Sequence, residues 1–245
     1  MRINENALMP LAPPTLDTAP RVALIHALAA SVEPINTALQ RQWPQARRMN
    51  LLDDSLSADL ATSAASAASA NGLDDAMTAR FLALADYAVG TGASAILFTC
   101  SAFGPCIEAV KARHPGLPVL KPNEAMVDAA AAWAAEAGAG AKVGLLATFA
   151  PTLASMPPEF PPAVALDTEL ADGALAALQA GDAAGHDRIA IEAAHRLAAR
   201  GCGVIALAQF SLARAAAAIE AALGLPVLTT PDSAVAALKK RLPGG

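Results

Sequence analysis

A cysteine at position 100 has the residue type and the placement best suited to chemistry. Cys100 closes the apolar run Ala95–Cys100 and is followed by Ser101-Ala-Phe-Gly-Pro105, a turn that leads into a helical pattern. A thiol beside a helix N-terminus meets the positive end of the helix dipole and free backbone N–H groups, which favour the thiolate. We therefore expect Cys100 to have a lowered pKa and to be the most reactive of the three cysteines. The alternative is a buried structural cysteine, because free cysteine is among the most buried residue types.

The other cysteines and the histidines have weaker claims. Cys106 falls in the first turn of the helix after Cys100, and Cys202 begins a strand at the end away from a ligand, so both are interpreted as structural. His26 ends the first strand on the ligand side, where it is either a ligand contact or a hydrogen-bonded core histidine. No His, Cys and Asp pattern has metal-ligand spacing, and no phosphate-binding glycine motif follows a strand. The sequence therefore predicts neither a metal ion nor a cofactor.

Hydroxyl and amide side chains cluster where the predicted strands end. They are Thr99, Ser101, Thr148, Thr152, Gln209, Ser211, Thr229 and Thr230. Neutral donors of this kind can hold a carboxylate or an enolate oxygen without a fixed cation. The same residue types cap helices at the same places. Both interpretations stay open at this point.

Strand and helix patterns alternate along the chain and predict the elements that position these side chains. The predicted strands are Arg21–Leu28, Ala46–Leu52, Ala95–Cys100, Leu117–Leu120, Lys142–Ala147, Ala163–Leu166, Val204–Ala208 and Leu225–Leu228. Ala-rich helical segments lie between them, including Leu73–Val89, Asn123–Ala137, Gly185–Arg200 and Ser211–Leu223. This alternation is typical of α/β proteins with mainly parallel sheets. Ligands of such sheets bind beyond the carboxyl ends of the strands.

The chain also repeats itself. Gly92–Cys100 aligns without a gap on Gly201–Gln209, and Gly116-Leu-Pro-Val-Leu120 aligns on Gly224-Leu-Pro-Val-Leu228. Any two strand–helix–strand segments share some pattern, but the common pentapeptide and the repeated order favour a duplication. Cys100 and Gln209 then stand at equivalent strand ends of two similar units. A cleft between such units is a common place for a small-molecule site.

Composition excludes several classes of protein. Of the 245 residues, 55% are hydrophobic and 16% are charged, which is unlike a disordered chain. The mean hydropathy is +0.41, yet no run of about 20 strongly apolar residues is present, so no membrane span is predicted. The net charge of −5 without a basic run argues against a nucleic-acid partner. Residues 1–20 are Pro-rich and unlike a signal peptide, so we expect an N-terminal extension and a cytoplasmic protein. Homo-oligomerisation stays open.

Several segments together resemble the aspartate/glutamate racemase superfamily, which includes hydantoin racemases, maleate isomerases and arylmalonate decarboxylases. They are Ala95–Gly104, Pro118–Asn123, Gly144–Thr148 and Gly203–Ala208. The resemblance implies two pseudo-symmetric Rossmann-like α/β domains with an interdomain cleft and cofactor-independent proton transfer next to a carboxylate. We expect the first domain at 21–122 plus 226–245 and the second at 123–225. The C-terminal helix, about Pro231–Leu242, should return to the first domain.

The resemblance also implies roles for individual residues. Racemases of this group use two cysteines, one per half; the first maps onto Cys100, and the second maps onto Gln209, so one thiol is absent. The Thr-His pair after the second cysteine is Phe210-Ser211 here, Thr148 matches the usual hydroxyl, and an aspartate of glutamate racemases maps near His26. The predicted site has Cys100 and Gln209 as catalytic residues, and its predicted substrate-binding residues are Ser101, Thr148, Phe149, Phe210, Ser211, His26 and Thr230.

A single thiol predicts one-sided chemistry. We expect thiol-based proton transfer at the carbon next to the carboxylate of a small amino acid or related acid. One alternative is a decarboxylase or a cis-trans isomerase of small dicarboxylic acids. Another is a non-catalytic protein that binds small carboxylates. A second base such as His26 would be needed for racemisation.

Overall fold

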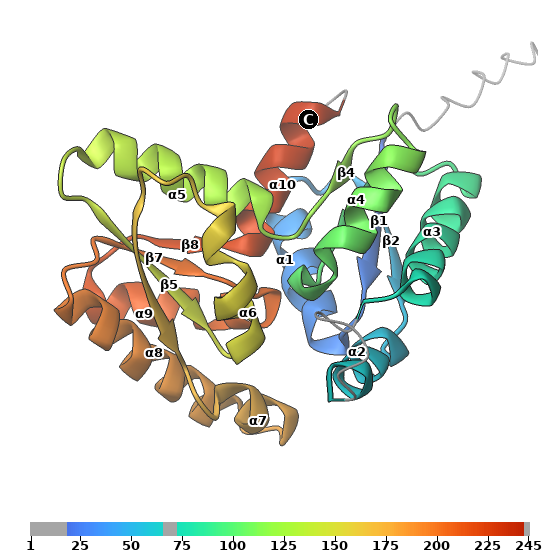
Figure 1. Ribbon diagram of the computed structural model, residues 1–245. Coiled ribbons are helices and arrows are strands. Elements are labelled where there is room, and N and C mark those ends of the chain that lie inside the picture. The colour runs from blue at the N-terminus through green and yellow to red at the C-terminus, as the bar shows by residue number, and fades with distance from the viewer. Residues whose placement is uncertain (1–18, 66–72, 243–245) are drawn as a thin grey trace, which may run out of the picture.

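The computed structural model describes residues 19–65 and 73–242, and it contains two parallel four-stranded sheets (Figure 1). The first sheet has the order β2-β1-β3-β4 and the second has the order β6-β5-β7-β8. The strands are β1 (Arg21–His26), β2 (Arg47–Leu52), β3 (Ala95–Phe98), β4 (Val119–Leu120), β5 (Lys142–Ala147), β6 (Ala165–Leu170), β7 (Val204–Leu207) and β8 (Val227–Thr229). This is the α/β class with two like units that the sequence predicted. Most of the predicted extension, residues 1–18, lies outside the described residues.

Helices cover both faces of each sheet. The α-helices are α1 (Val32–Gln42), α2 (Ser55–Ala65), α3 (Asp75–Gly90), α4 (Gly104–Arg113), α5 (Glu124–Ala137), α6 (Ala150–Ser155), α7 (Ala174–Gln179), α8 (Ala183–Ala199), α9 (Ala216–Leu223) and α10 (Thr230–Arg241). Short 3₁₀ turns are η1 (Ala29–Ser31), η2 (Ser101–Phe103), η3 (Pro157–Glu159) and η4 (Phe210–Ala215). Among the described helices, none combines the length and the apolar character that a bilayer crossing requires.

Alternating strand residues fill two cores per sheet, as the two-residue period of a strand requires. In β1, Val22 and Leu24 face the core under α1 and α10, whereas Ala23 and Ile25 face the core under α3 and α4. The second sheet likewise packs on α8 and α9 on one face and on α5 and α6 on the other. The inner strands are buried on both faces, which explains their continuous apolar runs.

The two sheets have the same register, which confirms the repeat. Val22 and Ile25 of β1 pair with Ala95 and Phe98 of β3. In the second sheet, Val143 and Leu146 of β5 pair in the same way with β7. The backbone hydrogen bonds just beyond β3 and β7 are also equivalent. The Thr99 N–H donates to the Ile25 carbonyl, and the Ala208 N–H donates to the Leu146 carbonyl. Cys100 and Gln209 follow these two residues and occupy equivalent positions.

One predicted domain boundary needs correction. Residues 226–245 were assigned to the first domain, but β8 pairs with β7 in the second sheet. Helix α10 does return to the first domain, as predicted. Its residues Val235 and Leu238 join the core formed by β1 and α1, and the helix also contacts α5 of the second unit (Figure 1).

This docking of α10 gives a stability prediction. Leu238 is fully buried in the core of the first domain, so Leu238→Ala leaves a cavity there. We expect it to lower the free energy of unfolding by about 2–5 kcal/mol. The exposed Lys240 provides the control, since Lys240→Ala should change stability by less than about 0.5 kcal/mol. Urea denaturation followed by circular dichroism measures both, and equal effects would refute the docking.

Candidate functional site

The carboxyl ends of the two sheets face each other through their strand-end loops. Turn η2, which follows β3, contacts α6 of the second unit, and η1, which follows β1, contacts η4. The first contact brings the loop after β3, which holds Cys100 and Ser101, next to the helix that follows Thr148, and Gln209 is hydrogen-bonded to Thr148. The juxtaposition follows from the two parallel sheets, whose strand ends each gather at one edge.

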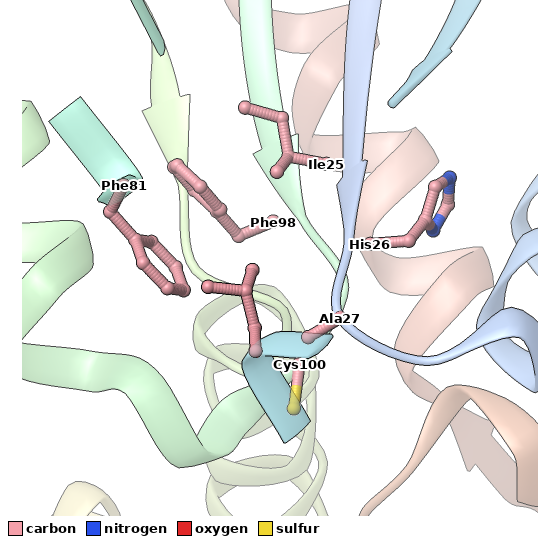
Figure 2. A pocket seen from close by; sticks show the side chains of 7 residues that line it. Ile25, His26, Ala27, Phe81, Phe98 and Cys100 are labelled. Atoms are coloured by element: carbon pink, nitrogen blue, oxygen red, sulfur yellow. The ribbon is translucent and has the colours of Figure 1, made fainter. Parts of the chain in front are cut away.

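Cys100 lies in a narrow, mainly apolar recess (Figure 2). The recess is lined by Ile25, His26, Ala27, Leu56, Phe81, Phe98 and Cys100. Phe81 stacks on Phe98 with ring centroids 5.3 Å apart, which fixes one wall. Cys100 itself is partly exposed, whereas Cys106 and Cys202 are buried. The side chains around Cys100 pack so closely that this recess leaves no room for a water molecule.

The expected lowering of the Cys100 pKa is wrong. Burial raises the pKa of this thiol above its ordinary value, and a backbone hydrogen bond from Ala102 offsets that effect only in part. The reason is that the apolar walls disfavour the charged thiolate. The turn that follows Cys100 is also a short 3₁₀ segment, and α4 starts only at Gly104.

This direction predicts how Cys100 reacts with iodoacetamide. Its labelling should be slow near pH 7 and should rise above about pH 8.5, because the thiolate is the nucleophile and its pKa is raised. Cys100 should still react before Cys106 and Cys202, which are buried. Peptide mass spectrometry across a pH series measures the three rates. Faster labelling of Cys106 or Cys202 would make Cys100 a structural residue.

Gln209 is held in one orientation by Thr148. Its Oε1 accepts hydrogen bonds from the Thr148 backbone N–H at 2.6 Å and from the Thr148 hydroxyl at 2.9 Å. A backbone N–H can only donate, so the atom facing it must be the amide oxygen. The Gln209 NH₂ group consequently turns the other way, with no hydrogen-bond partner in the described part of the chain. It offers two free donors beyond the end of β7.

His26 behaves as a core histidine. Its side chain is fully buried, with Nδ1 2.9 Å from the Thr99 hydroxyl and Nε2 3.0 Å from Asn50 Oδ1. The Asn50 oxygen requires a proton on Nε2, so Nδ1 accepts from Thr99. Burial lowers the His26 pKa, and Figure 2 shows the ring across β1 from Phe81 and Phe98. The prediction of a substrate contact at His26 is therefore not supported.

The remaining predicted residues divide into accessible and buried groups. Ser101 is partly exposed, and Phe149 is 42% exposed beside Thr148. Ser211 is buried but borders a groove of about 650 Å³ between α1, α7, η4 and the start of α10. Thr230 is fully buried, and its hydroxyl has no hydrogen-bond partner among the described residues. Neither the recess of Cys100 nor this groove includes Gln209 in its lining.

The prediction that Phe210 contacts the substrate does not fit the structure. Its side chain is 2% exposed and packs in the core of the first domain with α1 and α10. A phenyl ring in that position locks the two units together and cannot reach a ligand.

Sequence reasoning missed two residues that shape the recess. Leu56 lies in the first turn of α2, shortly after the end of β2, and Phe81 lies on α3. The position of Leu56 beyond a strand end was a usable indication. Phe81 was not foreseeable, because a buried aromatic residue in a helix is ordinarily interpreted as core.

Two like α/β units, with Cys100 after β3 of one and the oriented amide of Gln209 after β7 of the other, form a two-domain protein. The chain belongs to the family described as Asp/Glu/Hydantoin racemase, whose model matches residues 29–238. The family assignment confirms the predicted resemblance and the prediction of an enzyme of the racemase class of isomerases.

Solved structures share the fold at low sequence identity. A glutamate racemase from Bacillus anthracis is 11% identical with a TM-score of 0.66, covering 91% of this chain and 81% of its own. An allantoin racemase from Klebsiella pneumoniae is 17% identical with a TM-score of 0.66, covering 91% and 87%. An arylmalonate decarboxylase is 16% identical with a TM-score of 0.56, covering 93% and 94%. No curated protein matches the chain in sequence.

Proposed function

We propose that the protein catalyses one-sided, thiol-based proton transfer at the carbon next to the carboxylate of a small acid. The observation that carries this proposal is the asymmetry of the two equivalent strand ends, with Cys100 on one and the oriented amide of Gln209 on the other. A planar enolate between them has a proton carrier on one face and hydrogen-bond donors on the other. The reaction needs these side chains alone, with no metal ion or cofactor.

Burial raises the Cys100 pKa, so the minor ionised fraction of the thiol takes the α-proton. The C–H electron pair then moves into the enolate, whose oxygen gains negative charge. The Gln209 NH₂ group donates to that oxygen, and Ser101 is placed beside Cys100 as a further donor. The proton then returns from the same thiol to the same face. Oriented neutral donors are effective here because they need no reorganisation when the charge develops.

A specific observation favours decarboxylation as a second candidate. The raised pKa of Cys100 keeps the thiol protonated at neutral pH, so its resting form is a proton donor. In that reaction the bond to a departing carboxylate of a malonate breaks, CO₂ leaves, and the electron pair remains as the enolate. Cys100 gives its proton to the α-carbon and regains one from solvent.

Deuterium uptake tests the proposal against a binding-only role. The protein is incubated in D₂O with single enantiomers of amino acids and hydantoins and with 2,2-disubstituted malonates, followed by NMR. We expect deuterium at the α-carbon of substrate or decarboxylation product for at least one class. Ligands that shift the melting temperature without any incorporation would instead identify a carboxylate-binding protein without catalysis.

A further inference from the structure

We propose that a groove between the two units binds a small amine that also carries a neutral hydrogen-bonding group. This α1 groove has a volume of about 650 Å³, which suits a small molecule, and lies between α1, α7, η4 and the start of α10. Helices α1 and α10 lie side by side where the two units meet (Figure 1). Neither Cys100 nor Gln209 lines the groove, so this inference is independent of the proposed function.

A buried hydroxyl without a partner lines the α1 groove. Ser211 is 4% exposed and belongs to the lining. Its hydroxyl forms no hydrogen bond within the described part of the chain. Buried polar groups are ordinarily hydrogen-bonded, because an unpaired one has lost its contact with water without compensation. A polar group of a ligand in the groove supplies the partner that Ser211 lacks.

The two arginines that line the groove already have carboxylate partners. Arg41 pairs with Asp232 of α10. Arg214 donates to Asp187 from Nε at 2.9 Å and from Nη2 at 3.2 Å. Bidentate contacts of this kind are among the stronger hydrogen bonds in proteins. An anionic ligand would compete with these partners and would also meet Glu33 and Asp232 in the lining.

Glu33 has no such partner. It is exposed in the first turn of α1, where its Oε1 accepts a hydrogen bond from the Thr37 hydroxyl at 2.9 Å. Among the described residues it forms no ion pair. Asp187 and, to a lesser extent, Glu33 raise the pKa of Arg214, so the Glu33 carboxylate lies near that guanidinium without contacting it. An ammonium group complements a carboxylate in this situation.

Small apolar side chains form most of the remaining lining. Ala30, Pro34 and Ala38 come from the first unit, and Leu178 and Ala213 come from the second. They accommodate an apolar body between the ammonium group and the group that pairs with Ser211. Because both units contribute to the lining, a ligand in the groove contacts both.

Four related compounds test the chemistry of the ligand. Tyramine has an ammonium group, an apolar ring and a hydroxyl; 4-ethylphenol lacks the ammonium group, 3-(4-hydroxyphenyl)propanoate has a carboxylate in its place, and phenethylamine lacks the hydroxyl. Isothermal titration of the wild-type protein at low salt should show tyramine binding at least about fivefold more tightly than each of the others. Equal or tighter binding of the neutral or the anionic compound, or no binding of tyramine at millimolar concentration, would overturn the inference.

Two substitutions test the position of the ligand. Glu33→Gln keeps the shape of the side chain and should remove the preference for tyramine over 4-ethylphenol, whereas Glu136→Gln removes an exposed carboxylate from α5 and should retain it. Ser211→Ala should lower the affinity for tyramine to that for phenethylamine, and leave phenethylamine binding unchanged. An unaltered preference in a Glu33→Gln protein that circular dichroism shows to be folded would place the amine elsewhere and overturn the inference. These titrations need no turnover, so their outcome does not depend on catalysis by Cys100.

Discussion

Cys100→Ser should abolish α-deuterium incorporation, lowering kcat/KM by about 10²–10⁴-fold. The serine hydroxyl is a far weaker acid than a thiol, so it can neither give nor take the α-proton at neutral pH. Substrate binding should change little, because the recess is formed by the surrounding apolar walls rather than by the sulfur alone. The loss should therefore appear in kcat. NMR of the α-position in D₂O measures the rate.

Cys106→Ser is the matched control for this loss. Cys106 is buried on α4 with its sulfur 3.6 Å from the Thr78 hydroxyl, so a serine there keeps a polar partner. Its activity should stay close to that of the wild type. A Cys100→Ser enzyme that retained half of the wild-type rate would show that another group transfers the proton.

Gln209→Leu should lower kcat by about 10²–10³-fold, the usual cost of removing one oriented donor to an oxyanion. Two hydrogen bonds from Thr148 hold Oε1 and turn the NH₂ group outward, so the donor is positioned before the enolate forms. Leucine keeps the approximate volume and removes both donors. Stopped-flow or NMR rates at saturating substrate separate kcat from KM.

Thr148→Ser is the control for the orientation of Gln209. Serine keeps both the backbone N–H and the hydroxyl, so the amide should keep its orientation and most of the activity should remain. If Gln209→Leu were as active as Thr148→Ser, Gln209 would have no part in catalysis. Gln209→Cys extends the test, since a second thiol opposite Cys100 should introduce racemisation.

The inner strands and the duplication were predictable because they depend on local sequence. Both β3 and β7 are fully buried, so each is a continuous apolar run with the same spacing to its strand-end residue. Edge strand β6 was predicted at Ala163–Leu166 but spans Ala165–Leu170. The strand includes the polar residues Asp167, Thr168 and Glu169. Glu169 forms ion pairs with Arg196 and Arg200. Ion pairs from a distant helix support that strand, and its own pattern does not reveal them.

The equivalence of the strand ends that carry Cys100 and Gln209 was predictable from the sequence repeat, and the structure has them at matching positions. The electrostatic surroundings of Cys100 were not predictable. Burial raises the pKa of Cys100, and the recess around it includes Leu56 of α2 and Phe81 of α3, which no local pattern reveals. Phe210 was misassigned for a similar reason, because it leaves its own unit and enters the core of the other.

The handedness of α-deuterium tests the central claim of one-sided proton transfer most directly. A single enantiomer of a compound that exchanges its α-proton is incubated in D₂O with the wild-type protein, and chiral chromatography with mass spectrometry follows both enantiomers. The asymmetry of Cys100 and Gln209 predicts deuterated substrate of the starting configuration, with the opposite enantiomer absent while exchange goes to completion. Appearance of both enantiomers at the rate of deuterium uptake would contradict the claim, because it requires a second proton carrier on the Gln209 face.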